Sequence, residues 1–186
     1  MIPEPSFTIP KLSPGFEANI TLPGSKSIAL RQLAMSALVS GTSRITGIPE
    51  CDDTDAMIDC LKALGVTVET QGRSLLVTGP MDFGSQTVAL NARMSGASTR
   101  LLIALAALRT GSTLIDGHDS LRVRTNAPLF DVLRQHGCQI DSEDGGLPAS
   151  ISGPIHVQDT LRIDGSLSSQ YITALMVIAP VLARRQ

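Results

Sequence analysis

One short stretch of the chain combines the residue types that bind anions. The tetrad Gly24-Ser25-Lys26-Ser27 precedes an apolar run over residues 28–39, and Arg31 lies one turn further along. We expect the apolar run to be a helix, preceded by a short strand over residues 19–22. Free backbone N–H groups at the start of a helix favour anions. A lysine, two hydroxyls and an arginine at that start therefore predict a phosphate or carboxylate site.

The same layout returns twice further along the chain. Residues 96–100 (Gly-Ala-Ser-Thr-Arg) open a second apolar run, and residues 165–170 (Gly-Ser-Leu-Ser-Ser-Gln) open a third. Taken alone, each of the three stretches is also typical of an ordinary helix N-cap. The first is no P-loop ending, because that motif needs glycine where Ser25 stands. Three such helix starts in one small chain favour ligand binding over capping alone.

Composition excludes several classes of function. The chain has 186 residues, of which 42% are hydrophobic and 17% charged, enough for one domain with a substantial core. A net charge of −2, four Phe, one Tyr and no Trp argue against a nucleic-acid partner. The apolar runs over 101–108 and 172–183 are too short, or interrupted by Pro180, to span a membrane.

The cysteines and histidines indicate no metal site. Cys51, Cys60 and Cys138 form no CxxC pair, and the chain start is too polar for a signal peptide, so we expect reduced thiols and a cytoplasmic location. The three histidines are scattered without metal-ligand spacing. We expect neither a metal nor a cofactor.

An internal repeat of about 70 residues organises the chain. Each unit is expected to read β-α-β-α-β-β, with a first helix that is apolar all round and buried, and a second that is amphipathic and lies on the surface. The fold class is thus α/β (α+β), with units around a pseudo-threefold axis and the apolar helices inside. The segments that match in order are 41–47 with 111–117, 61–66 with 133–138, and 77–80 with 151–154.

The repeat also sets the expected domain organisation. Unit 1 covers about 17–80, unit 2 about 86–154 and an incomplete unit 3 about 158–186, within one domain over 16–186. Unit 3 has a predicted strand over 160–163 and its first helix, but no second helix and no closing strands. We therefore expect another polypeptide, or a longer chain, to complete it. Residues 1–15 are expected to belong with that missing part.

Four ordered motifs resemble the enolpyruvyl transferases, and within them the 5-enolpyruvylshikimate-3-phosphate synthases. The resemblance covers nearly the whole chain. The sister enzymes that act on UDP-N-acetylglucosamine carry Gly-Ala-Lys-Asn at the first motif, so Ser25 and Ser27 speak against them, although a relative of that group stays an alternative. The motifs are residues 22–27 with Arg31, the Asp52-Asp53-Thr54 triplet, Ser120 to Arg124, and Asp164 to Tyr171.

The resemblance implies transfer of the enolpyruvyl group of phosphoenolpyruvate to the 5-hydroxyl of shikimate 3-phosphate, in the shikimate pathway of aromatic amino acid biosynthesis. It implies that Lys26 takes part in proton transfer. We expect Arg122 to be only a solvated neighbour of the site. For Asp52-Asp53-Thr54 we favour a helix N-cap with an acidic first turn. By resemblance, shikimate 3-phosphate is held by Ser27, Arg31, Ser168, Ser169 and Gln170, and phosphoenolpyruvate by Lys26, Gly96 and Arg124.

Departures from the family pattern limit this expectation. Thr125 stands where the family has proline, and Met94 to Leu101 replace Asn-Ala-Gly-Thr-Ala-Met-Arg-Pro, so we expect altered sensitivity to the family inhibitor glyphosate. Arg100 lies on an apolar helix and needs a partner or a ligand.

Family members are more than twice as long, with further catalytic carboxylates in a second domain. The chain is thus expected to be an enzyme half, inactive without a C-terminal half. The alternatives are a binding module for shikimate 3-phosphate and a structural repeat protein without a ligand.

Overall fold

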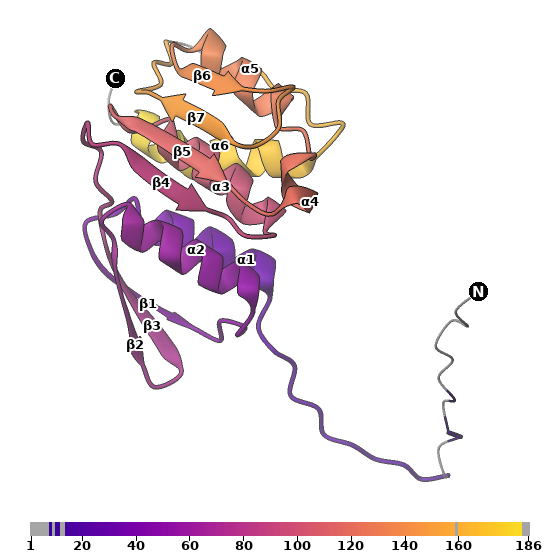
Figure 1. Cartoon of the computed structure of the whole chain (residues 1–186). Helices are drawn as coiled ribbons and strands as arrows, with labels where there is room; N and C mark the ends of the chain where they lie inside the picture. Colours follow the sequence, from indigo (N-terminus) through magenta and orange to yellow (C-terminus); the bar gives the residue numbers. More distant parts are fainter. Residues whose placement is uncertain (1–7, 9, 12–13, 159, 184–186) are drawn as a thin grey trace.

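Two β-sheets and the helices that cover them make up the chain (Figure 1). The computed structural model describes residues 8, 10–11, 14–158 and 160–183. The α/β fold class predicted from the sequence is confirmed. Most of the expected segment 1–15 and the last residues 184–186 lie outside the described residues.

The first sheet has three antiparallel strands in the order β1-β3-β2. Two helices pack against each other beside it (Figure 1). The elements of this half are α1 (Lys26–Ser36), β1 (Gly41–Thr46), α2 (Asp52–Ala63), β2 (Thr67–Gln71) and β3 (Ser74–Gly79).

The second sheet has four strands in the order β4-β5-β7-β6, in which only the β4–β5 pair is parallel. Its strands β5, β7 and β6 pair in the same order as β1, β3 and β2, as the predicted repeat requires. The pseudo-threefold axis itself stays a prediction. The remaining elements are β4 (Val88–Asn91), α3 (Gly96–Ala106), β5 (Ser112–Asp116), α4 (Asp119–Arg122), α5 (Ala127–Gln135), β6 (Gln139–Ser142), β7 (Ala149–Ser152) and α6 (Ser169–Ala183).

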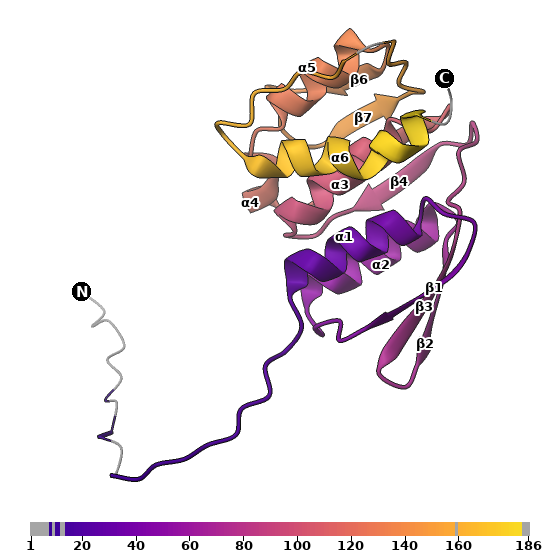
Figure 2. The same cartoon turned by 180° about the vertical axis from the view of Figure 1, so that it is seen from behind.

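The predicted burial of the first helix of each unit is right for α3 but wrong for α1 and α6, because Met35 of α1 and Met176 of α6 are 47% and 69% exposed. Every residue from Leu101 to Leu108 is at most 4% exposed, and α3 packs against α1, α2 and α6 (Figure 2). By contrast, α2 is amphipathic: Met57 and Leu61 are fully buried, whereas Asp55 and Asp59 face the solvent. Burial of one apolar helix face holds each sheet to the core.

Two predicted strands are wrong. Residues 19–22 and 160–163 belong to no strand. A strand needs a partner for its backbone N–H and C=O groups, and neither stretch pairs with a strand of the described chain. Residues 16–22 are all exposed and run away from the body of the molecule (Figures 1 and 2). By contrast, the strand that precedes the first helix of unit 2 does form: β4 pairs with β5.

A fully buried arginine joins the two halves of the chain. Arg109 follows α3, and its guanidinium donates to the backbone oxygens of Asp82 (3.0 Å) and Gln86 (2.9 Å) in the connection between β3 and β4. It also donates to Oγ1 of Thr113 on β5, at 2.8 Å. These bonds satisfy polar groups that would otherwise be buried without partners, which fixes the connection against α3.

Candidate functional site

The first anion-binding motif lies at the start of α1. Ser25 is the N-cap, and its hydroxyl accepts a hydrogen bond from the Ile28 N–H at 3.4 Å. The helix therefore begins at Lys26, two residues earlier than predicted. Arg31 folds back along the helix and donates to the Ser27 backbone oxygen at 3.0 Å. The side chains of Ser25 and Arg31 are exposed, so the first turn of α1 presents its hydrogen-bond donors to the solvent.

Three of the sequence motifs meet in one small pocket. We call it the three-helix pocket, because its walls are the first turns of α1, α3 and α6, which start at the same end of the molecule (Figure 2). Its volume is about 40 Å³. Of the residues predicted to bind shikimate 3-phosphate, it unites Ser27, Arg31 and Gln170. The full lining is Ser27, Leu30, Arg31, Ala97, Leu101, Gln170 and Thr173.

The two predicted serines lie at the same helix start. The Ser168 hydroxyl accepts from the Gln170 N–H at 3.2 Å, and α6 begins at Ser169. Just before them, Asp164 accepts from the Ser166 N–H at 2.8 Å. Hydrogen bonds from Ser166 lower the pKa of Asp164. These local bonds shape the turn that aims the start of α6 at the pocket.

Two guanidinium groups crowd the start of α3. Ser95 caps this helix, and Gly96 is its first residue. A methyl group placed on Gly96 would lie 2.7 Å from Nη1 of Arg100 and 3.2 Å from Nη1 of Arg124. Arg124 is exposed and, among the described residues, its side chain has no hydrogen-bond or ion-pair partner. Glycine thus allows both cations to approach the helix start.

Arg100 is buried and is balanced by no carboxylate of the described chain. Its guanidinium donates to the backbone oxygens of Gly96 (2.8 Å) and Thr125 (3.2 Å). The Tyr171 hydroxyl of α6 donates to the same Thr125 oxygen, at 2.9 Å. Nε of Arg100 has no partner. Burial lowers the pKa of Arg100, and the charge of Arg124 lowers it further. The expected need for a partner is met by carbonyl groups, which leave a positive charge beneath the helix start.

Lys26 has a partner that was not predicted as a site residue. Its ammonium lies 3.2 Å from Oδ2 of Asp53, on the first turn of α2. Burial would raise the pKa of Asp53, but hydrogen bonds from Ser95 and Lys26 outweigh it and bring the pKa below its ordinary value. The Asp-Asp-Thr motif was the signal that could have identified Asp53. From the sequence alone, the triplet is expected to cap the helix.

The capping prediction is partly right. Asp52, Asp53 and Asp55 form an acidic first turn, but the N-cap is Cys51. Thr54 reaches back to accept a hydrogen bond from the Cys51 N–H at 3.3 Å. The side chain of Asp53 is therefore free to turn toward α1.

Arg122 lies apart from these groups. It donates to both carboxylate oxygens of Asp116, at 2.9 and 2.8 Å, and to Asp119 at 3.1 Å. The hydrogen bond from Arg122 lowers the pKa of Asp116. Its neighbours are thus carboxylates rather than the pocket, and its role is to hold α4 against β5.

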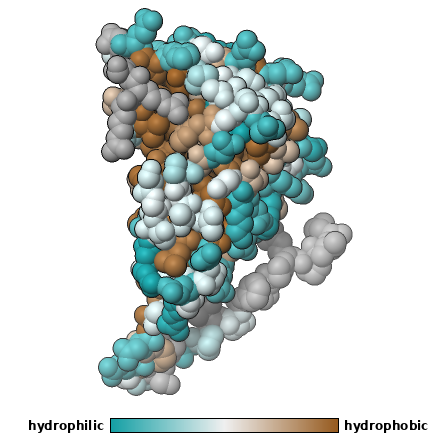
Figure 3. All heavy atoms as spheres, turned by 90° about the vertical axis from the view of Figure 1, so that its left-hand side faces the viewer, coloured by the Kyte–Doolittle hydropathy of each residue, from teal (hydrophilic) through white to brown (hydrophobic). Residues whose placement is uncertain are grey.

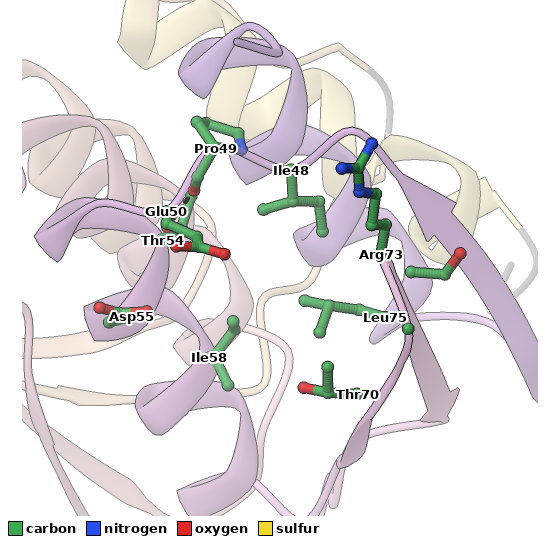
Figure 4. A pocket seen from close by; sticks show the side chains of 11 residues that line it. Ile48, Pro49, Glu50, Thr54, Asp55, Ile58, Thr70, Arg73 and Leu75 are labelled. Carbon is green, nitrogen blue, oxygen red and sulfur yellow. Dashed lines mark hydrogen bonds between the residues drawn. The ribbon is translucent and has the colours of Figure 1, made fainter.

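Other hollows of the described chain contain few of the predicted residues. A pocket of about 200 Å³ lies between α2 and the β2–β3 hairpin, with Arg73 across an apolar floor from Glu50 (Figure 4). An apolar pocket of about 220 Å³ lies between α1 and α6, where Met176 is 69% exposed. Brown surface is visible beside the grey C-terminal residues at this end of the molecule (Figure 3). Within the described ranges, no group of three or more His, Cys, Asp or Glu side chains could hold a metal ion.

The geometry suits a polyanion. Lys26, Arg31, Arg100 and Arg124 surround three helix starts, and Asp53 is the one carboxylate that contacts them in the described structure. Helix N-termini and charge-assisted hydrogen bonds are strong anion ligands. For proton transfer these groups supply only the Lys26 ammonium and the Asp53 carboxylate. Among the described helices, none has both the length and the apolar character to cross a membrane.

Comparisons with known proteins identify the family. The family model described as EPSP synthase (3-phosphoshikimate 1-carboxyvinyltransferase) matches residues 13–186. The 3-phosphoshikimate 1-carboxyvinyltransferase of Rhizobium leguminosarum bv. trifolii is 40% identical over 159 residues, which cover 84% of this chain and 38% of that protein. The Bordetella pertussis protein of the same name is 39% identical over 170 residues, or 89% and 38% of the two chains.

Solved structures give the same picture. The EPSP synthase of Acinetobacter baumannii superposes with a TM-score of 0.71 at 25% identity, over 85% of this chain and 37% of that one. The enolpyruvyl transferase NikO of Streptomyces tendae shares the fold, with a TM-score of 0.57 at 18% identity, over 88% and 38% of the two chains. The chain spans about 38% of the length of the first curated relatives that it matches.

Proposed function

This chain belongs to the EPSP synthase family, and on that premise we propose that it supplies the N-terminal part of the site that transfers enolpyruvyl from phosphoenolpyruvate to the 5-hydroxyl of shikimate 3-phosphate. The observation that carries the proposal is the three-helix pocket. Its lining unites Ser27, Arg31 and Gln170, which come from motifs about 140 residues apart in the sequence. A purely structural repeat gives no reason for the polar side chains of two motifs to line one pocket.

Shikimate 3-phosphate is the proposed ligand of the pocket. Ser27 and Gln170 offer a hydroxyl and an amide to the ring hydroxyls of the substrate. Arg31 offers a guanidinium to its anionic groups. Ser168 and Ser169 stand at the start of α6, where a phosphate gains from the free N–H groups and the helix dipole.

Phosphoenolpyruvate is proposed to bind beside it, at the starts of α1 and α3. Its charges meet the Lys26 ammonium, the N–H groups of the turn at Gly96 and the Arg124 guanidinium. The buried charge of Arg100 adds to the attraction, because it lies beneath the same turn and faces no carboxylate of the described chain. Two polyanions side by side repel each other, so cations from several helices are needed to bind both.

Catalysis is proposed to need a complementary C-terminal half or domain. The chain spans about 38% of the length of its curated relatives, and its own candidate groups for proton transfer are Lys26 and Asp53. We place the reaction in the cytoplasm, where the three free thiols of the chain stay reduced. No nucleic acid or membrane enters the proposed reaction, and we propose no cofactor.

A second candidate function is a binding module that holds shikimate 3-phosphate without turnover. The scarcity of proton-transfer groups in the described site favours it. An enolpyruvyl transferase for UDP-N-acetylglucosamine is less favoured, because the relatives reported above are named for 3-phosphoshikimate.

Calorimetric titration of shikimate 3-phosphate into the purified chain tests the proposal. We expect saturable binding that weakens about 10- to 100-fold in Arg31→Ala, since a charge-assisted hydrogen bond contributes roughly 1.5–3 kcal/mol. Arg134→Ala is the matched control, because Arg134 lies on α5 outside the pocket and bonds to Asp131 at 3.2 Å. Equal affinities for the wild type and Arg31→Ala would contradict the proposed site.

A further inference from the structure

Asp53 lies where three helix starts meet. Its carboxylate, on the first turn of α2, accepts from the Lys26 ammonium of α1 at 3.2 Å. Its backbone oxygen lies 3.4 Å from the Ser98 hydroxyl, which in turn lies 2.7 Å from the Ser95 hydroxyl. Both serines are buried. Asp53 is thus anchored to α3 and holds the ammonium of α1.

A carboxylate in this place opposes anion binding. Its negative charge lies within hydrogen-bonding distance of Lys26, which reduces the attraction of that ammonium for phosphoenolpyruvate. A role that helps the binding of phosphoenolpyruvate must therefore be geometric. The Lys26 side chain is 49% exposed and has four rotatable bonds to order, and ordering such a side chain on binding costs free energy.

We propose that Asp53 is a positioning residue, which holds the Lys26 ammonium between the starts of α1 and α3 before phosphoenolpyruvate arrives. The inference rests on the proposed function of that site. Because Ser98 of α3 holds the backbone of Asp53, its carboxylate has a fixed origin, and the ammonium is ordered without the ligand. The low pKa of Asp53 agrees with this, since the ionised carboxylate is the form that pairs with the Lys26 ammonium.

Asp52 provides a matched control. It lies on the same first turn and carries the same charge, but its carboxylate accepts from Arg93 at 2.6 Å instead of from Lys26. Asp53→Asn and Asp52→Asn remove the same charge from the start of α2, and so the same favourable interaction with the helix dipole. A difference between the two variants is therefore due to the contact with Lys26. Circular dichroism melts would establish that both variants fold.

The first test needs no ligand. NMR relaxation of the Lys26 side chain is measured in the wild type, Asp53→Asn and Asp52→Asn. We expect Lys26 to be ordered in the wild type and Asp52→Asn, and mobile in Asp53→Asn. If Lys26 is equally mobile in the wild type and Asp53→Asn, the positioning role is overturned, whatever the chain binds.

The second test is the affinity for phosphoenolpyruvate, and its sign is decisive. Positioning predicts that Asp53→Asn binds about three- to tenfold more weakly, the cost of ordering one long side chain, that Asp53→Glu recovers part of the loss, and that Asp52→Asn stays close to the wild type. If Asp53 acts only through its charge, Asp53→Asn binds more tightly and the inference is overturned. If Lys26 is ordered by Asp53 but the wild type does not bind phosphoenolpyruvate, the proposed function fails while the contact between the two residues stands.

Discussion

A methyl group at Gly96 would disturb the start of α3, and Gly96→Ala therefore tests the geometry of this part of the site. The added carbon would lie 3.2 Å from Arg124, whose exposed side chain can move away, but 2.7 Å from Nη1 of Arg100. Arg100 is only 7% exposed and is bonded to the oxygens of Gly96 and Thr125, so it cannot move without weakening those bonds.

The magnitudes predict a larger effect on binding than on stability. Weakening the bonds of a buried guanidinium costs about 1.5–3 kcal/mol, and replacing glycine with alanine in a helix returns about 1 kcal/mol. The free energy of unfolding should thus fall by roughly 0.5–2 kcal/mol. The methyl group also shields the N–H groups of the turn, and losing one charge-assisted bond weakens phosphoenolpyruvate binding by about 10- to 100-fold.

Calorimetric titrations with both substrates, with urea denaturation as the stability control, provide the assay. Shikimate 3-phosphate should bind Gly96→Ala within about twofold of the wild type, because its proposed contacts are on α1 and α6. If Gly96→Ala binds phosphoenolpyruvate as tightly as the wild type, the start of α3 does not hold this substrate, and the reasoning is refuted.

Four further predictions concern the fold, the cysteines and inhibition. Arg109→Met leaves three acceptors without their donor, of which Thr113 is fully buried, and should lower the free energy of unfolding by about 3–5 kcal/mol in urea titrations; a loss below about 1 kcal/mol would contradict the joining role of Arg109. Burial raises the pKa of Cys60 and Cys138 to about 11, so a thiol reagent at neutral pH should react first with Cys51 and reach the other two only on unfolding, which mass spectrometry of the labelled chain would check. The same shifts stabilise the fold below the ordinary thiol pKa of 9.0, and this stabilisation should be lost in melts as the pH rises toward about 11. Glyphosate inhibition of a reassembled enzyme should differ from that of a typical family member, and superposable inhibition curves would count against this.

The sequence predicted those elements whose pattern is local. The buried character of α3 followed from its unbroken apolar run, and the matched segments 41–47 and 111–117 contain β1 (Gly41–Thr46) and β5 (Ser112–Asp116). Turn glycines and alternating side chains mark such strands within a few residues of sequence. The start of α1 was placed two residues too late, because Lys26 and Ser27 read as part of the loop.

Long-range pairing explains most of what was missed. Residues 19–22 have the composition of a strand, but a strand depends on a partner that local sequence does not reveal. The contact of Asp53 with Lys26 joins two helices 27 positions apart in sequence, and the Asp-Asp-Thr triplet alone fits an N-cap equally well. Only the packing of α1 against α2 distinguishes these roles.

The most direct test of the proposed function is phosphate release from phosphoenolpyruvate and shikimate 3-phosphate. The assay compares the chain alone, the C-terminal remainder of the Rhizobium leguminosarum relative alone, and the two mixed. We predict release only in the mixture, and its loss when the chain carries Lys26→Ala. Release by the chain alone would contradict the proposal that it holds only part of the site, and a folded mixture that binds both substrates without releasing phosphate would identify the chain as a binding module.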